Sequence, residues 1–186
     1  MDDFDAADVA RGIHELYEPL AEDNGLSLEV RAEPAWLHGN RELVSQALAN
    51  LVENAIKYGQ PAPALQPANG DAAGGETSGH EARKILIESR RDGDQALLSV
   101  TDRGPGIPEA DRDHAVERFV RLEASRTQPG SGLGLSLAAA VATLHGGELR
   151  LSDASPGLTA TLAIPALKDA GDRLAVQTQD VPQKAA

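Results

Sequence analysis

The feature that most constrains the fold is the repeated change between helical and strand periodicity along the chain. Within residues 5–24 the apolar side chains recur every three or four residues, which is the spacing of an amphipathic helix. Residues 27–31 then alternate in the manner of a half-buried strand. Both patterns return later, so the sequence predicts helices and strands that share one core.

The remaining elements are predicted by the same reasoning and by their start and stop residues. Asn40 is a plausible N-cap for a second helix that reaches Tyr58, and a Gly-Gly pair at 146–147 ends a later one. Further helices are predicted at 111–119 and 133–145. Further strands are predicted at 36–38, 84–90, 95–101, 148–152 and 158–164.

This element order predicts an α+β domain, a two-layer sandwich of helices on one face of a mixed, mostly antiparallel sheet. Aromatic residues make up only 3% of the chain, so aliphatic side chains must fill the core. We expect one domain over residues 1–165. Residues 59–80 are rich in Gly, Ala and Pro and are predicted to be a flexible insertion loop, and 166–186 a disordered tail.

The charge and the lack of cysteine narrow the class of protein. A formal net charge of -12 discourages binding to nucleic acid or to a membrane surface. The chain has no cysteine, which excludes disulfides and thiolate metal sites and fits a reducing, cytoplasmic compartment. We find no signal peptide and no membrane span, so any membrane anchor is expected outside this chain.

The first candidate motif is an asparagine-rich helix. Steps of four and three residues place Asn50, Asn54 and Lys57 on one helical face. An asparagine oxygen can bind Mg²⁺ and a lysine can meet a phosphate, so this face suggests a shared polar ligand. The alternative is an ordinary solvated helix face.

The second motif follows a predicted strand at residues 102–108. Asp102 stands at the strand end and could accept a hydrogen bond from an amine such as that of adenine. Gly104 and Gly106 then permit close backbone approach. The alternative is an ordinary Asp-Gly turn.

Two further motifs point to phosphate. The glycine-rich run 130–135 opens a helix, where free N–H groups and the helix dipole favour an anion. It lacks the endings of the Walker and dinucleotide-binding loops, so it could also be only a hinge. Arg118, Arg121 and Arg126 precede it and suit phosphate, although singly they could be a surface charge cluster.

Taken together and in this order, the motifs resemble the catalytic, ATP-binding domain of sensor histidine kinases. That superfamily also includes gyrase, Hsp90-type chaperones and MutL. The resemblance covers about residues 5–165 and rests on the asparagine helix, DRGPGIP, ERFVR, GSGLGLSL and LHGGELRL. It implies a Bergerat-type fold with ATP beneath a mobile lid. Val116 stands where the family usually has a phenylalanine, so lid packing is expected to differ.

The resemblance also implies roles for individual residues. Asn54 corresponds to the Mg²⁺ ligand, and Asn50, Lys57 and Arg121 to the other catalytic residues. The ATP-binding positions that it implies are Asn50, Asn54, Lys57, Tyr58, Asp102, Gly104, Gly106, Ile107, Arg121, Arg126, Ser131, Gly132, Leu133, Gly134 and Leu135. The cofactors implied are ATP and Mg²⁺.

The residue at position 50 favours a kinase over a hydrolase. In the hydrolases of this superfamily a glutamate stands there to activate water, whereas an amide is no base near neutral pH. Glu53 points about 100° away from Asn54 on a helix. An ATPase and a nucleotide-binding regulatory module without catalysis remain the rival hypotheses.

The phosphoacceptor histidine is expected outside this chain. His14-Glu15 followed by Pro19-Leu20 looks like an acceptor motif, but the interval to Asn50 cannot hold two helices of about 25 residues. His145 is interpreted as a helix cap. The expected partners are histidine-bearing dimerisation helices, normally in the same polypeptide, and then a response-regulator receiver domain.

Overall fold

A computed structural model describes residues 1–59, 83–116 and 134–167 of the chain. The helices in these ranges are α1 (Ala6–Asp23), α2 (Arg41–Tyr58), α4 (Glu109–Ala115) and α5 (Gly134–Leu144). The strands are β1 (Asp2–Asp5), β2 (Ser27–Ala32), β3 (Trp36–Gly39), β4 (Lys84–Asp92), β5 (Gln95–Thr101), β6 (Glu148–Asp153) and β7 (Leu158–Pro165).

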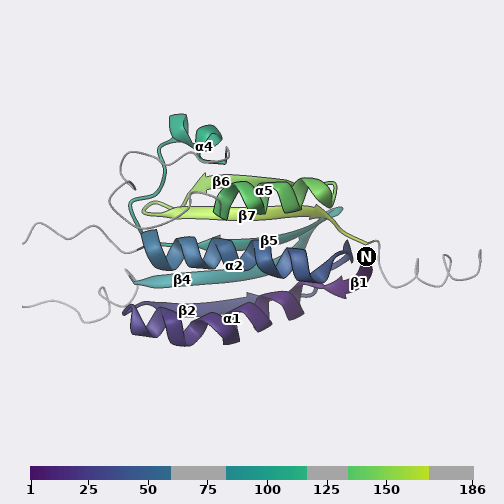
Figure 1. The fold of residues 1–186 in the computed structure, drawn as a ribbon, viewed down its shortest axis with the longest axis horizontal. Coiled ribbons are helices and arrows are strands. Elements are labelled where there is room, and N and C mark those ends of the chain that lie inside the picture. Colours follow the sequence, from purple (N-terminus) through teal and green to yellow (C-terminus); the bar gives the residue numbers. More distant parts are fainter. Residues whose placement is uncertain (60–82, 117–133, 168–186) are drawn as a thin grey trace, which may run out of the picture.

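The main sheet has five strands in the order β2-β4-β5-β7-β6. The β2–β4 pair is parallel, and every other pair in this sheet is antiparallel. Figure 1 shows α1, α2 and α5 side by side on one face of the sheet, with α4 outside this layer. The predicted fold class, helices layered on a mixed and mostly antiparallel sheet, is therefore confirmed.

The core lies between this sheet and the helix layer and is aliphatic, as the composition predicts. Alternation along β4 sends Ile85 and Ile87 into the core, while Arg90 is exposed on the other face. The largest fully buried side chains include Leu37, Leu48, Ile85, Ile87, Leu98, Leu162 and Ile164. This core holds α2 against both the sheet and its neighbouring helices.

Residues 2–5 form a strand that the sequence did not reveal. β1 pairs antiparallel with β3, and its one apolar side chain, Phe4, is buried in the core. Asp5 then ends the strand and caps α1, because its Oδ1 accepts hydrogen bonds from the backbone N–H of Ala7 (3.0 Å) and of Ala35 (2.8 Å). Four residues with three aspartates carry too little alternation to predict a strand.

Most other predicted elements are present with small changes at their ends. Asn40 caps α2 as predicted, with its side chain accepting from the Leu43 N–H at 3.0 Å. The helix predicted at 111–119 begins earlier, at Glu109. The predicted insertion loop from residue 60 onward and the tail from residue 168 onward lie outside the described residues. Ala166 and Leu167 still form backbone hydrogen bonds, to Asp94 and Trp36.

His145 joins the end of α5 to the start of α2. Its Nδ1 lies 2.7 Å from the Val141 carbonyl, which can only accept, so Nδ1 donates. Its Nε2 then accepts from the Asn40 N–H at 2.9 Å. This agrees with its interpretation as a cap, and it ties together the two helices that carry most of the candidate site.

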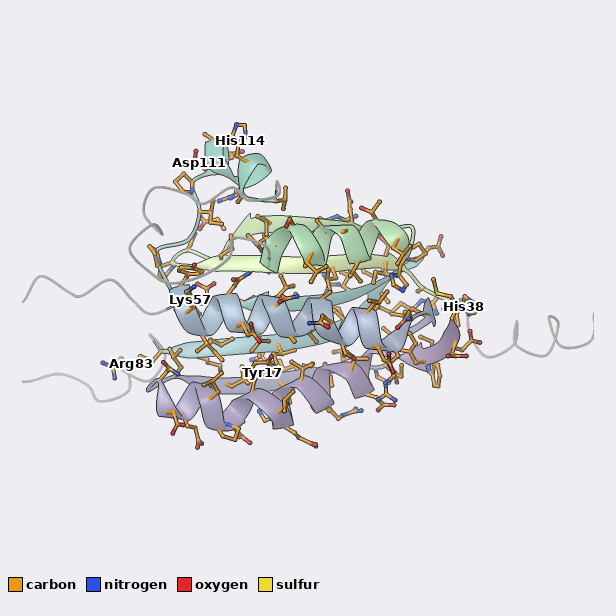
Figure 2. All side chains as sticks on the ribbon, in the orientation of Figure 1. Tyr17, His38, Lys57, Arg83, Asp111 and His114 are labelled. Carbon is orange, nitrogen blue, oxygen red and sulfur yellow. The ribbon has the colours of Figure 1, made fainter. Side chains whose placement is uncertain are left out.

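Tyr17 joins α1 to α2 by a hydrogen bond across the helix layer. Its hydroxyl donates to Glu53 Oε1 at 2.6 Å, and Figure 2 shows Tyr17 between the two helices. Burial, the hydrogen bond to Glu53 and the charge of Glu53 raise the pKa of Tyr17 to about 12. The Glu53 carboxylate is therefore held on the α1 side of α2.

This bond predicts how stability depends on alkaline pH. Tyr17 ionises near pH 10 when unfolded and near 12 when folded, so its contribution is complete below pH 10 and is lost as pH rises through about 12. Tyr17→Phe should lower the free energy of unfolding at neutral pH by about 1 kcal/mol or less. Its stability should then fall less steeply than that of the wild type between pH 10 and 12, as measured by urea denaturation.

The chain has two tyrosines, which provides a direct control. In Tyr58→Phe only Tyr17 remains, and its phenolate absorbance should appear near pH 12. Parallel stability curves for Tyr17→Phe and wild type through this window would contradict the Tyr17–Glu53 hydrogen bond.

Candidate functional site

The second half of α2 carries the polar side chains that the sequence singled out. Asn50 and Asn54 are partly buried and one helical turn apart, on a helix whose apolar side packs into the core. The Asn50 Nδ2 atom is buried and has no hydrogen-bond partner among the described residues. A buried donor without an acceptor costs about 1–3 kcal/mol, so such a group calls for an explanation.

Asn54 faces the start of α5. Gly134 begins that helix, and a Cβ atom added there would lie 2.8 Å from Asn54 Nδ2 and 3.3 Å from Asn54 Oδ1. The shorter of these distances is well below the van der Waals contact distance between the two atoms. Only a glycine lets the N-terminus of α5 approach the Asn54 amide this closely.

Lys57 and Tyr58 lie at the C-terminal end of α2, where Figure 2 labels Lys57. The Lys57 Nζ atom stands 5.0 Å from the centroid of the Tyr58 ring, which is cation–π distance. Both side chains are partly exposed. The ammonium group is therefore kept at the helix end and remains accessible to an anion.

Asp102 is a buried carboxylate directly after β5. Its Oδ1 atom accepts hydrogen bonds from the backbone N–H of Gly104 (2.8 Å) and of Leu158 (3.3 Å). Burial raises the pKa of the Asp102 carboxyl, and these two hydrogen bonds lower it in part. No described residue bonds to Oδ2, so this oxygen is available to accept from a ligand.

Glycine backbones bring the end of α2 against the Asp102 turn. A Cβ atom on Gly59 would lie 2.7 Å from the Cβ of Asp102. A Cβ atom on Gly104 would overlap the Tyr58 carbonyl oxygen and lie 2.8 Å from the Cα of Gly59. These contacts place Asp102 and the Lys57–Tyr58 pair at the edges of one site.

The turn between β6 and β7 packs against Asp102 and Gly106, a contact that the sequence did not reveal. A Cβ atom on Gly106 would lie 2.8 Å from the Gly157 carbonyl oxygen, and Gly157 itself lies against the backbone of Asp102. Gly59, Gly157 and Leu158 were not predicted as site residues. In the sequence they stand beside a helix end and a strand start, and only their contacts across the fold reveal the link.

The structure describes some of the residues that the sequence predicted for the site. It brings together α2, the 102–106 turn and the start of α5, which carry Asn50, Asn54, Lys57, Tyr58, Asp102, Gly104, Gly106 and Gly134. Ile107 follows this turn with its carbonyl bound by Arg112 Nε at 3.0 Å, and Leu135 packs against the core. Arg121, Arg126, Ser131, Gly132 and Leu133 lie outside the described residues.

Two groups that could compete for a catalytic role are engaged elsewhere. Glu53 accepts from Tyr17, on a different side of α2 from the Asn54–Gly134 contact. His14 Nε2 lies 3.1 Å from the Leu28 carbonyl and donates to it. Its side chain is 18% exposed, so His14 packs onto β2 and is not presented as an acceptor.

Within the described ranges, 1–59, 83–116 and 134–167, no cluster of three or more His, Asp or Glu side chains could hold a metal ion. Within the same ranges no helix has both the length and the apolar character needed to cross a membrane.

Comparison with known proteins identifies the family. Residues 39–168 match the family described as histidine kinase-, DNA gyrase B-, and HSP90-like ATPase. The signal transduction histidine-protein kinase/phosphatase MprB of Mycobacterium sp. (strain KMS) is 32% identical over 155 residues, 83% of this chain and 26% of that protein. MprB of Mycobacterium avium (strain 104) is 36% identical over 135 residues, 72% of this chain and 22% of that protein.

A solved structure supports the same assignment. That of a mycobacterial sensor histidine kinase MprB has a TM-score of 0.68 and 26% identity, and the match covers 90% of this chain and 99% of that chain. The chain thus spans about a quarter of the length of the curated relatives, whose full-length proteins contain more than this domain. It belongs to the histidine kinase-, DNA gyrase B-, and HSP90-like ATPase family, as a catalytic domain of the sensor histidine kinase type.

Proposed function

We propose that this domain binds Mg·ATP between the second half of α2, the 102–106 turn and the start of α5. It would then donate the γ-phosphoryl group to a histidine on a separate helical module. The observation that carries the proposal is the buried Asn50 Nδ2 donor, which has no partner among the described residues. An acceptor oxygen from the nucleotide would satisfy it.

Asp102 supports adenine as the base. Its Oδ1 is occupied by two backbone N–H groups, so Oδ2 is the oxygen that can accept from an exocyclic amine. Adenine carries such an amine. Because burial disfavours the charged carboxylate, a hydrogen bond from the base would also relieve part of the cost of burying it.

The other end of the site suits phosphates. Lys57 supplies a positive charge at the end of α2, and Arg121 and Arg126 are predicted to approach the triphosphate. Asn54 would bind the Mg²⁺ ion, which neutralises phosphate charge when bound. Because Mg²⁺ commonly takes only one or two protein ligands, together with waters and substrate phosphates, Asn54 would share the ion with the nucleotide.

The donor role is favoured over hydrolysis by the surroundings of α2. Asn50 is an amide and cannot act as a base, and Tyr17 holds Glu53 on the α1 side. Phosphoryl transfer depends mainly on positioning and charge neutralisation, which the Asn50, Asn54 and Lys57 face can supply. A site built this way holds ATP until another nucleophile arrives.

The acceptor would be a histidine on dimerisation helices, normally part of the same polypeptide. His14 donates to the Leu28 carbonyl and belongs to the packing of α1. From that histidine the phosphoryl group would pass to an aspartate of a response-regulator receiver domain. The domain would work in the cytoplasm, as part of a longer sensor kinase.

A nucleotide titration tests the two ends of the site separately. Asp102→Asn should weaken binding of a non-hydrolysable ATP analogue about tenfold or more, because the amide oxygen stays with the Gly104 and Leu158 N–H donors and the amide –NH₂, itself a donor, replaces the oxygen that faces the base. Asn54→Ala should bind with little dependence on Mg²⁺. Calorimetry with and without Mg²⁺ measures both effects. Failure of the folded wild type to bind would contradict the proposal.

The contact between Gly134 and Asn54 gives a gentler test. Gly134→Ala adds a methyl group 2.8 Å from the end of a flexible side chain, so the protein should fold while the Asn54 amide is displaced. We expect ATP binding by Gly134→Ala to depend less on Mg²⁺ than binding by the wild type, as in Asn54→Ala, when measured by the same calorimetry.

Gly12→Ala is the matched control for this variant, because Gly12 lies within α1 with nothing within 4 Å of its added Cβ. It should raise stability by up to about 1 kcal/mol and leave binding unchanged. Unaltered Mg²⁺ dependence in Gly134→Ala would show that this contact does not position Asn54.

Phosphotransfer distinguishes a kinase from its rivals. With γ-labelled ATP the isolated chain should remain unlabelled, whereas added histidine-bearing dimerisation helices from an MprB-type kinase should become labelled.

Label on the chain that disappears in His14→Gln would contradict the assignment of the acceptor. Basal hydrolysis that falls in Glu53→Gln would favour an ATPase. Tight ATP binding without transfer would favour a regulatory module.

A further inference from the structure

We propose that Gly157, in the turn between β6 and β7, is a positioning residue that sets the preference for adenine by fixing the direction of the Asp102 carboxylate. The proposal rests on the proposed function, since it concerns how the same site selects its base. Gly157 lies outside every motif that the sequence identifies, six residues after the end of LHGGELRL.

The turn and Asp102 are joined by reciprocal hydrogen bonds. The Asp102 N–H donates to the Leu158 carbonyl at 3.0 Å, and the Leu158 N–H donates to Asp102 Oδ1 at 3.3 Å. Leu158 follows Gly157 directly, so the path of the chain at Gly157 decides where this N–H points. Together with the Gly104 N–H at 2.8 Å, it fixes Oδ1 between two donors.

Gly157 is buried, and only a glycine fits there. A Cβ atom would overlap the Asp102 carbonyl oxygen and would lie 2.7 Å from the Asp102 carbonyl carbon and 3.0 Å from the Arg103 Cα. The neighbouring atoms belong to the backbone and cannot rotate away. Gly157 also has φ +113°, a conformation that residues with side chains rarely adopt. A side chain at 157 would therefore move the backbone that carries Asp102.

This arrangement has a consequence for base selection. Because Oδ1 is occupied by the Gly104 and Leu158 donors, Oδ2 is the oxygen left for the base. The 6-amino group of adenine can donate to a carboxylate, whereas guanine presents an oxygen at that position, which repels it. Discrimination depends on keeping the carboxylate in one direction, so it should weaken when the turn moves.

The experiment compares Gly157→Ala with Gly93→Ala. Gly93 lies in the β4–β5 turn with φ +58°, and nothing lies within 4 Å of its added Cβ. Both variants introduce a side chain at a positive φ, but only Gly157→Ala presses on Asp102. The readout is the ratio of affinities for non-hydrolysable ATP and GTP analogues in the presence of Mg²⁺. General loss of stability would lower both affinities and leave this ratio unchanged.

We expect the ATP-to-GTP affinity ratio to fall about tenfold in Gly157→Ala and to stay at the wild-type value in Gly93→Ala. In an Asp102→Asn background, Gly157→Ala should lower the ratio no further, because both changes act through one group. An unchanged ratio in folded Gly157→Ala would overturn the proposal, as would a second, additive loss in the double variant.

A second variant serves if Gly157→Ala does not fold. Leu158→Pro removes the N–H that bonds Oδ1 and adds no atom at position 157, and proline is accepted at the first residue of a strand. It should lower the same ratio, and an unchanged ratio would overturn the proposal.

A titration without nucleotide separates this proposal from the proposed function. Carbon-detected NMR of the Asp102 carboxyl should give a higher pKa in Leu158→Pro than in wild type, because a hydrogen bond that lowers it is lost. Suppose that this shift occurs but the wild type binds neither analogue. The turn then positions Asp102, while the proposed nucleotide binding, and with it the base selection, has failed. No shift and no change in the ratio would overturn the positioning role itself.

Discussion

The burial of the Asp102 carboxylate is the constraint on which the rest of the site depends. Desolvation opposes its charge, so the fold must supply donors, and it does so from two segments through the Gly104 and Leu158 N–H groups. Those donors reach Asp102 only because the chain segments around it approach very closely. Glycines stand at the contacts, namely Gly59, Gly104, Gly106 and Gly157. The close packing of three chain segments is therefore a requirement of placing one charged acceptor inside the domain.

The side chains on different sides of helix α2 have different contacts. Leu48 and Val52 are fully buried in the core, Glu53 is bound by Tyr17 of α1, and Asn54 meets the start of α5 at Gly134. The same helix thereby keeps its one nearby carboxylate away from the amide face. This separation supports the proposed role as a phosphoryl donor, because no described carboxylate of α2 stands beside Asn54 to activate water.

Much of the fold could be predicted from the sequence, because long elements have a clear period. The alternation in β4 and the Asn40 cap of α2 are local features, and the structure confirms them. The strand at residues 2–5 could not be predicted, because its only apolar signal is Phe4 and it is stable through pairing with β3. The start of α4 at Glu109 was missed by two residues, since Pro108 caps it without a side-chain hydrogen bond.

For the site, the sequence by itself determined which chemistry is present: amides and a lysine on one face of α2, an acid after β5 and a glycine at the start of α5. Spacing along a helix or strand is a local property, so these features are visible without the fold. Only the tertiary structure decided that Asn50 Nδ2 is buried without a described partner, that Tyr17 engages Glu53, and that Gly157 and Leu158 hold Asp102. The physical reason is that burial and hydrogen bonding between distant segments arise from packing, and residues 102 and 158 become neighbours only when β5 pairs with β7.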